Sequence, residues 1–375
     1  MSPGCKSGKR GHMCNKRYSN EDLLKSGIPV PEWWESTEEQ IQAVIDNEVH
    51  KGQTRLLAVS PGGREIKAVY YGEAEPELKG TANFNSAIAA GSPDYFFRRG
   101  LRKRPVLVLL AGVHGQELEG MVGAVSVLKL METGKDLMGM EQPSLLSKLE
   151  KLRLVVIPIA NPDGRARVPY DGWVGLPYME MTKYGQGTRL NGKLYGWPYC
   201  KAVHPMVGDV GILGGYFDDA GINIQKDDYA LPMSPVTRAV LELVRDEGPD
   251  MLINIHGHEY DPCILPVPYI PDAAKKELLM FYNRFYATLK KKGYTGREFD
   301  ILGSGGLDGE AIPSFDLDSM LYHTGAGTCF TFESPHGCSD MRKQDHTVYE
   351  KNPYNYDDIL KIYHLLIEDA ADFLL

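Results

Sequence analysis

Apolar runs alternate with amphipathic segments along most of the chain. The runs at 105–113 and 152–160 are dominated by Val, Leu and Ile, as in strands that are covered on both faces. The segment at about 117–131, which follows the first run, is predicted to be a helix. Strands and helices that alternate in this way predict one α/β domain, with a mixed, mostly parallel twisted sheet and helices on both faces.

The alternation continues toward the C-terminus without any internal repeat. The runs 250–256 and 328–334 are predicted strands. The segments 235–247, 273–292 and 356–375 are predicted helices. The last apolar strands therefore come late in the chain and belong to the same sheet as the first ones.

Shorter signals precede this core. Ser36 stands before a segment that is predicted to be a capped amphipathic helix. Its apolar positions are Ile41, Val44, Ile45 and Val49. Residues 54–72 contain two β-rich runs around Ser-Pro-Gly-Gly, which predicts a hairpin. Residues 73–104 are polar and rich in turn formers, so we expect a long surface loop there.

Two segments depart from the α/β pattern. Residues 1–34 are predicted to be an N-terminal extension, which leaves 35–375 as a single domain. Residues 165–232 are rich in Gly, Tyr, Trp and Pro and show little periodicity. A loop of that length in a compact domain is usually a functional cover or a recognition surface. The alternative is that its aromatic side chains simply pack the loop down.

Composition narrows the classes of partner. The chain has 375 residues, a net charge of −9 at pH 7 and a hydrophobic content of 43%. An acidic protein of this kind is expected to bind neither nucleic acid nor an anionic membrane surface. No apolar run reaches the roughly 18 residues that a membrane-spanning helix needs, and no secretory signal is recognisable. The 6 cysteines are scattered, so reduced thiols and a cytoplasmic location are expected.

Candidate chemistry begins where the first buried strand ends. His114 follows that strand, and Glu117 lies three residues later in the first turn of the predicted helix. Ligands in open α/β sheets bind beyond the carboxyl ends of the strands. One imidazole and one carboxylate are suitable zinc ligands, and a catalytic site needs a third ligand and an open position. The alternative is a structural histidine beside a capping glutamate.

Two later strands end in residues that complete such a site. The run 250–256 ends at His256, and His258 follows on the same face, so the pattern alone leaves both open as the third ligand. His256 is preferred because His114 lies equally close to its strand. Glu333 lies at the end of the last strand, where it would be the natural general base beside an activated water. The alternative is a solvated rim glutamate.

Together these motifs resemble the zinc carboxypeptidase family, which is related to aspartoacylase and succinylglutamate desuccinylase. The pieces "SPGGREI", "HGQE", "NPDG", "INIH" and "FTFE" stand in the family's order, and the similarity covers roughly residues 50 to 370. The resemblance implies a zinc carboxypeptidase-like fold. It also implies one Zn²⁺ ion held by His114, Glu117 and His256, with Glu333 activating the water.

In the family, an arginine downstream of "NPDG" stabilises the oxyanion that forms during the reaction. Arg165 and Arg167 follow the motif directly and are predicted to be catalytic, while Arg189 lies deeper in the loop. The resemblance alone does not choose among these three arginines.

The substrate-binding residues depart from the family pattern. Gln225 and Lys226 stand where the Asn-Arg pair that grips a C-terminal carboxylate is expected. Asn223 replaces the aspartate that supports a zinc histidine, and can still accept a hydrogen bond from an imidazole. Ile301 falls near the position of the family's mobile tyrosine. Tyr322 lies closer to "FTFE" than Ile301 does, and we assign it to substrate binding for that reason.

These observations predict a zinc-dependent hydrolase of amide or peptide bonds that acts on a peptide or a small amide. A deacylase or amidase acting on N-acyl amino acids is the alternative, favoured by the missing Asn-Arg pair. A catalytically inactive binding protein is a third hypothesis, and zinc content without turnover of any amide would support it.

Overall fold

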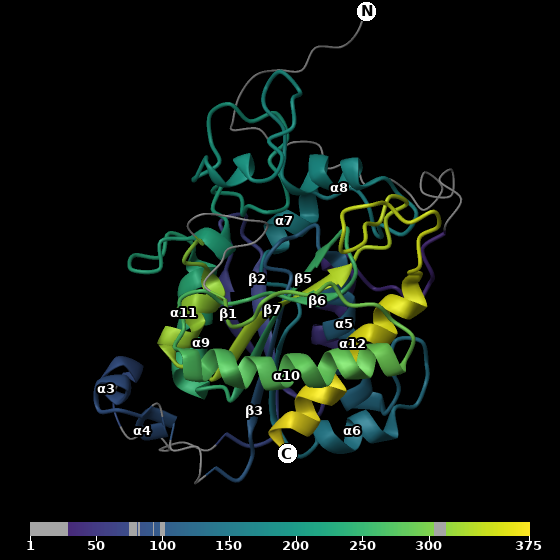
Figure 1. Ribbon diagram of the computed structural model, residues 1–375. Helices are drawn as coiled ribbons and strands as arrows, with labels where there is room; N and C mark the ends of the chain where they lie inside the picture. The colour runs from purple at the N-terminus through teal and green to yellow at the C-terminus, as the bar shows by residue number, and fades with distance from the viewer. Residues whose placement is uncertain (1–28, 75–80, 82, 93, 98–101, 304–312) are drawn as a thin grey trace, which may run out of the picture.

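A mixed sheet of seven strands runs through the centre of the molecule (Figure 1). The computed structural model of the chain describes residues 29–74, 81, 83–92, 94–97, 102–303 and 313–375. The order of the strands is β1-β2-β4-β3-β5-β7-β6. Their bounds are β1 Gln53–Val59, β2 Glu65–Tyr71, β3 Val106–Ala111, β4 Arg153–Ile157, β5 Met251–His258, β6 Cys263–Ile264 and β7 Thr328–Pro335.

The four central strands are parallel, and the outer ones are antiparallel. Strand β3 pairs in parallel with β4 and β5, and β5 pairs in parallel with β7. Strands β1, β2 and β6 join by antiparallel pairing. The carboxyl ends of β3, β5 and β7 therefore open at the same edge, where a ligand site is expected in an open sheet.

Helices cover both faces of the sheet, which confirms the predicted α/β architecture. In β3, Leu107 and Leu109 are buried in one core cluster, while Val108 and Leu110 are buried in another. The first cluster includes side chains of α5 (Leu118–Thr133), α10 (Asp272–Lys291) and α12 (Tyr356–Leu374). The second includes side chains of α9 (Pro235–Glu247) and α11 (Leu317–Thr324). Continuous apolar runs were needed because each central strand feeds two cores.

The first described residues pack into this domain. The structure describes residues 29–34 of the predicted extension, and Trp34 is buried against Tyr356 with a ring-centroid distance of 4.7 Å. Thr37, and not Ser36, caps helix α2 (Glu38–Asn47) in a capping box. Ser36 instead donates a hydrogen bond to the carbonyl of Asp171 at 2.7 Å. The packed domain therefore begins before residue 35.

The predicted surface loop 73–104 contains two short helices, α3 (Phe84–Ala89) and α4 (Asp94–Phe97). Phe84 and Phe96 are buried and lie 5.9 Å apart between ring centroids. The loop prediction was wrong here, because two aromatic side chains in a polar segment are enough to fix it to the core. Helix α6 (Pro143–Leu149) was also not anticipated.

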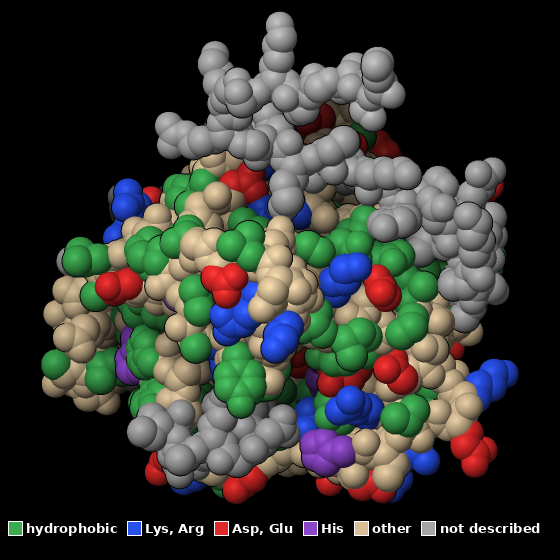
Figure 2. Space-filling view, turned by 90° about the horizontal axis from the view of Figure 1, so that it is seen from above, with side chains coloured by type: hydrophobic (Ala, Val, Ile, Leu, Met, Phe, Trp, Pro, Cys, Tyr) green, Lys and Arg blue, Asp and Glu red, His purple; other side chains and the backbone are tan. Residues whose placement is uncertain are grey.

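Residues 165–232 form an irregular segment above the carboxyl edge of the sheet (Figure 1). The helical pieces in or next to it are α7 (Pro162–Arg167), α8 (Tyr178–Gly185) and the single 3-10 turns η2 (Tyr199–Lys201) and η3 (Ile224–Lys226). A small core of its own holds the segment together; its buried members are Tyr195, Cys200, Met206, Tyr216 and Phe217. Seen from above, the part of this face not drawn in grey shows acidic and basic side chains among hydrophobic ones (Figure 2).

Within the described part of the chain, no helix combines the length and apolar character that crossing a membrane requires. Cys200, Cys263, Cys329 and Cys338 are buried and are not joined in disulfides within the described part of the chain. The remaining cysteines lie outside the described residues.

The turn between β1 and β2 is bound to the "NPDG" motif by Asp163. This carboxylate is fully buried and accepts hydrogen bonds from the Ser60 hydroxyl at 2.6 Å and the Gly62 N–H at 2.9 Å. It also pairs with the guanidinium of Arg64 at 2.8 Å. Two motifs that are far apart in the sequence thus form one structural unit. These three groups, which contact the Asp163 carboxylate, are all hydrogen-bond donors.

We expect Asp163→Asn to destabilise the fold by about 3 kcal/mol, because the new amide group faces donors and a buried ion pair is lost. Urea unfolding followed by circular dichroism measures this difference. Asp46→Asn is the matched control, since Asp46 pairs with Lys67 at 2.7 Å at the surface, and should cost less than about 1 kcal/mol. Equal losses in the two variants would contradict the role given to Asp163.

Candidate metal centre and its cavity

A cavity of about 420 Å³ opens at the carboxyl edge of the sheet. Its walls include the ends of β5 and β7, the connection between β3 and α5, and parts of the segment 165–232. Of the residues predicted to be functional, it is lined by His114, Glu117, Gln225, Lys226, His256 and Glu333.

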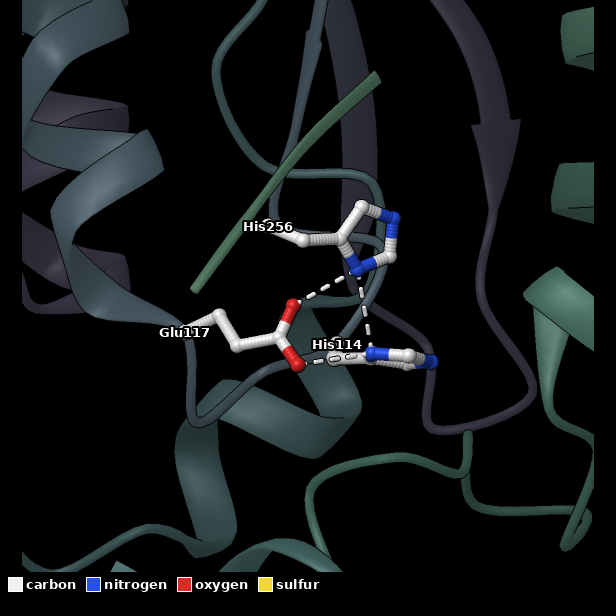
Figure 3. A group of neighbouring side chains, drawn as sticks. All are labelled: His114, Glu117 and His256. Carbon is white, nitrogen blue, oxygen red and sulfur yellow. Dashed lines mark hydrogen bonds and ion pairs between the residues drawn. The ribbon is translucent and has the colours of Figure 1, made fainter. Parts of the chain in front are cut away.

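Three of these side chains converge (Figure 3). His114 Nδ1 lies 2.8 Å from Glu117 Oε1, and His256 Nδ1 lies 2.7 Å from Glu117 Oε2. The two Nδ1 atoms are 3.2 Å apart. All three residues are buried, and their ligand atoms lie within 4.8 Å of one another. The structure therefore brings together the three residues predicted to be metal ligands.

The hydrogen bonds on the far side of both rings show why a cation fits here. His114 Nε2 lies 3.2 Å from Asn223 Oδ1, and His256 Nε2 lies 3.0 Å from Asn254 Oδ1. An amide oxygen only accepts, so each Nε2 carries the proton and each neutral Nδ1 presents a lone pair. Two lone pairs and a carboxylate then face one point, an arrangement that a divalent metal stabilises.

Asn223 occupies the supporting position predicted for it, and the ring of Tyr216 stacks on His114 with a centroid distance of 4.0 Å. His258, the alternative ligand, also lines the cavity but does not belong to the converging group. Its Nε2 lies 2.9 Å from the carbonyl oxygen of Asp261, and burial lowers its pKa to about 3.

The charges of the group are coupled. Burial alone would raise the pKa of Glu117, but the attraction of His114 and His256 outweighs it and lowers this pKa to about 2. Burial lowers the pKa of His256, although Glu117 opposes this effect. A carboxylate and neutral imidazoles are the protonation states that bind a metal ion.

A glycine allows the two main sequence motifs to meet. A Cβ atom at Gly115 would lie 2.0 Å from the backbone nitrogen of Arg165 and 2.1 Å from the carbonyl carbon of Gly164. The Gly115 N–H also donates to the carbonyl of Gly215 at 2.7 Å. Any side chain at Gly115 would push "HGQE" away from "NPDG" and displace both His114 and Glu117.

Glu333 lies opposite Cys263 and beside His256 in the strand register. Its Oε2 atom is buried and has no hydrogen-bond partner among the described residues. Burial raises the pKa of Glu333 well above its usual value, and the nearby charges of Glu117 and Glu259 raise it further. The cavity thus contains a carboxylate that is poised to hold a proton.

Arg165 and Arg167 do not line this cavity. The buried guanidinium of Arg165 donates to the carbonyls of Ser36 and Val168 and pairs with Asp171. Arg167 donates to carbonyls of the segment 213–217 and pairs with Asp219. Arg189, the third candidate, pairs with Asp209 and also lies outside. These contacts argue against the predicted oxyanion role and give the arginines a structural one.

The predicted substrate-binding residues divide. Lys226 lines the cavity, where its Nζ donates to Ser314 Oγ at 2.7 Å and lies 3.9 Å from Asp316. Gln225 lines it too, but its side chain is bonded to Asn254 and Asp318.

Tyr322 does not line the cavity. It is buried, and its ring lies 5.5 Å from that of Phe84, so its position argues against substrate binding. Ile301 is buried in the main core. Ile301 was compared with the family's mobile tyrosine because the sequence Ser-Gly-Gly follows at 304–306. Those three residues lie outside the described residues.

Several lining residues were not singled out from the sequence. Among them are Glu259, Arg297, Asp318 and Arg342. Glu259 follows His258 directly, so its place next to a strand end was a usable signal. The others come from irregular segments or from the unanticipated helix α11, where periodicity carries no information about position.

No protein-family model matches the sequence, and no curated protein sequence matches it. Solved structures do share its fold. A metallo-carboxypeptidase from Burkholderia cenocepacia superposes with a TM-score of 0.54 at 16% identity, over 90% of this chain and 68% of that one. A metallo-carboxypeptidase from Pseudomonas aeruginosa, in complex with (2-guanidinoethylmercapto)succinic acid, superposes with a TM-score of 0.51 at 14% identity, over 90% and 70%. The chain has the fold of these metallo-carboxypeptidases.

Proposed function

We propose that the protein is a zinc-dependent hydrolase of peptide or amide bonds, acting in the manner of a carboxypeptidase. The observation that carries the proposal is the convergence of His114, Glu117 and His256 in the cavity that also contains Glu333. Two histidines and one glutamate, with an open position beside them, are the ligand set of a catalytic zinc site. One ion would be held there.

The residues of the cavity support a hydrolytic mechanism. A zinc ion bound by these three residues would supply Lewis-acid chemistry, which polarises a carbonyl and lowers the pKa of water. Glu333 accepts the proton of the attacking water and delivers it to the leaving amine. Between the two transfers the carboxyl group holds the proton, which is the form that its burial favours.

The developing oxyanion needs a positive partner. Among the described residues, the arginines that line the cavity are Arg297 and Arg342. The charge of Arg297 lowers the pKa of Glu333, so the two groups lie close together. We therefore assign the oxyanion role to Arg297 in place of Arg165 and Arg167.

A peptide substrate would place its terminal carboxylate near Lys226. This ammonium group is a point charge and cannot form the bidentate contact that arginine offers. Trp197 and Tyr178, which line the cavity from the segment 165–232, would contact the rest of the substrate. That segment then acts as both a packed unit and a cover.

A deacylase or amidase acting on N-acyl amino acids is the second candidate. It is favoured by the engagement of Gln225 with Asn254 and Asp318, which leaves a single lysine where a carboxylate-binding pair is expected. The absence of nucleic-acid and membrane partners and the cytoplasmic location remain predictions from composition.

Replacing His256 by Ala should raise the zinc dissociation constant at least about tenfold, because a direct ligand is lost. Equilibrium dialysis followed by elemental analysis measures bound zinc. His258→Ala is the matched control two residues away and should bind zinc as the wild type does. Zinc lost from His258→Ala but retained by His256→Ala would show that the site is wrongly assigned.

Glu333→Gln should keep its zinc and lose roughly 10²–10⁴-fold in turnover, since the amide cannot take up the proton. Wild type and variant are each incubated with free-acid peptides, C-terminally amidated peptides and N-acyl amino acids, and the products are identified by mass spectrometry. Stepwise loss of C-terminal residues by the wild type alone supports the peptidase. Acyl release with intact peptides supports the deacylase, and wild-type rates in the variant refute the role of Glu333.

For a peptidase, Lys226→Met should raise KM for free-acid peptides about tenfold with little change in kcat, because it removes a binding contact away from the reacting bond. Steady-state kinetics on a matched acid and amide pair measures this. Lys201→Met is the control, since Lys201 lines the same cavity but its Nζ lies 3.7 Å above the Trp197 ring. An unchanged KM in Lys226→Met would remove Lys226 from carboxylate binding.

A further inference from the structure

A series of buried hydrogen bonds leads from His256 away from the candidate metal centre. The Nε2 atom of His256 lies 3.0 Å from the side-chain oxygen of Asn254, two residues earlier on the same face of β5. The Nδ2 atom of Asn254 in turn donates to Asp318 Oδ1 at 3.0 Å and to Gln225 Oε1 at 2.9 Å. Asn254 is fully buried, so these are contacts within the protein interior.

Asp318 is the end point of this chain. Its carboxylate is 2% exposed. Besides Asn254, it accepts hydrogen bonds from the hydroxyl of Thr331 and from Gln225 Nε2, the latter at 3.4 Å. Thr331 lies opposite Asn254 in the register of β7 and β5, and Asp318 belongs to α11. Three separate elements thus deliver donors to one buried carboxylate.

The direction of every bond in the chain follows from the metal-binding tautomer. If His256 Nδ1 presents its lone pair to the metal, Nε2 must donate, and Asn254 must turn its oxygen toward the ring. The Asn254 amide nitrogen then faces Asp318, whose carboxylate oxygen accepts its hydrogen bond. A carboxylate at the end of a histidine's hydrogen-bond chain raises the basicity of the ring and fixes its orientation.

Gln225 connects this chain to the support of the other histidine. Its backbone N–H donates to Asn223 Oδ1 at 3.0 Å. The same oxygen lies 3.2 Å from His114 Nε2. Its side chain meanwhile contacts both Asn254 and Asp318. A single residue therefore touches the supports of both imidazole ligands.

We propose that Asp318 acts through Asn254 as a positioning residue for His256, and that Gln225 joins this support to that of His114. This inference rests on the metal site of the proposed function. It reassigns Gln225 from substrate binding to the support of the metal centre. It also accounts for a carboxylate buried in the cavity wall, where an isolated charge would be costly.

The test is zinc binding by Asp318→Asn, measured as the dissociation constant and as the rate of zinc release to a chelator. Three donors surround the carboxylate, and the NH₂ group of the new amide would face at least one of them. This mismatch disturbs the support of His256, so we expect the zinc dissociation constant to rise about 10–100-fold. The thermal unfolding of the metal-free protein is measured in parallel, and a loss of zinc affinity without a matching loss of stability supports positioning.

Asp316→Asn is the matched control. Asp316 also lines the cavity, but its side chain accepts from Ser319 at the start of α11, a capping role that asparagine preserves. Wild-type zinc binding in Asp318→Asn would overturn the proposal. Equal losses in the two variants would also overturn it, because the effect would then be one of net charge.

An exchange variant separates hydrogen bonding from packing. In the double substitution Asn254→Asp with Asp318→Asn, the carboxylate accepts from His256 directly. The amide introduced at position 318 donates to that carboxylate after the Gln225 amide turns over. Recovery of zinc affinity toward the wild-type value supports the chain, and no recovery overturns it.

If Asp318→Asn does not fold, Thr331→Val carries the test, because it removes one donor and leaves the carboxylate in place. A smaller rise in the zinc dissociation constant supports the proposal, and no change overturns it. Failure of the proposed function is recognised separately, by a wild-type protein that binds no zinc or by His256→Ala retaining it.

Discussion

The convergence of two imidazole lone pairs and a carboxylate on one point is the constraint on which the rest of the site depends. Without a cation the two Nδ1 atoms, 3.2 Å apart, would repel each other unless one were protonated. The fold holds them there because β3 and β5 pair in parallel, with Ala111 opposite Ile255. The two histidines therefore lie at the ends of neighbouring strands, at the same edge of the sheet.

Such a site needs rigid support, since a buried polar group without partners is costly. Each imidazole is held by an asparagine, His114 by Asn223 and His256 by Asn254. The two supports differ in what lies behind them. Asn254 leads to the buried carboxylate of Asp318, whereas Asn223 is held by the backbone of Gln225 and by its own N–H, which donates to His204. The candidate metal centre is thus continuous with the polar interior of the protein.

The irregular segment 165–232 lines part of the cavity and is held in place by contacts with the residues around the site. Trp173 is fully buried and donates to the carbonyl of Gln116 at 2.7 Å, next to Glu117. Arg165 and Arg167 donate to carbonyls within this segment, those of Val168 and Leu213. Guanidinium groups with several donors in fixed directions are suited to satisfying loop carbonyls, because irregular backbone leaves many of them unpaired. Their positions after "NPDG" reflect this structural task.

The sequence by itself determined the α/β architecture, the hairpin and the convergence of His114, Glu117 and His256. These features follow from short-range rules, namely the length of apolar runs and the edge at which parallel strands end. The choice between His256 and His258 was open because both lie on one face of the strand. The structure separated them, since His256 Nδ1 lies 2.7 Å from Glu117 whereas His258 contacts the carbonyl of Asp261.

Tertiary structure alone decided what surrounds the ligands. Asp318, Arg297 and Arg342 reach the cavity from segments far from any motif, and nothing local distinguishes them from solvated charges. Gln225 looked like a substrate-binding residue because of its position in the chain, yet its partners come from two other elements, β5 and α11. Sequence patterns record which face of an element is buried. The partners of a buried polar side chain depend instead on how distant elements pack together. The hydrogen bonds behind the candidate metal centre therefore became visible only in the folded protein.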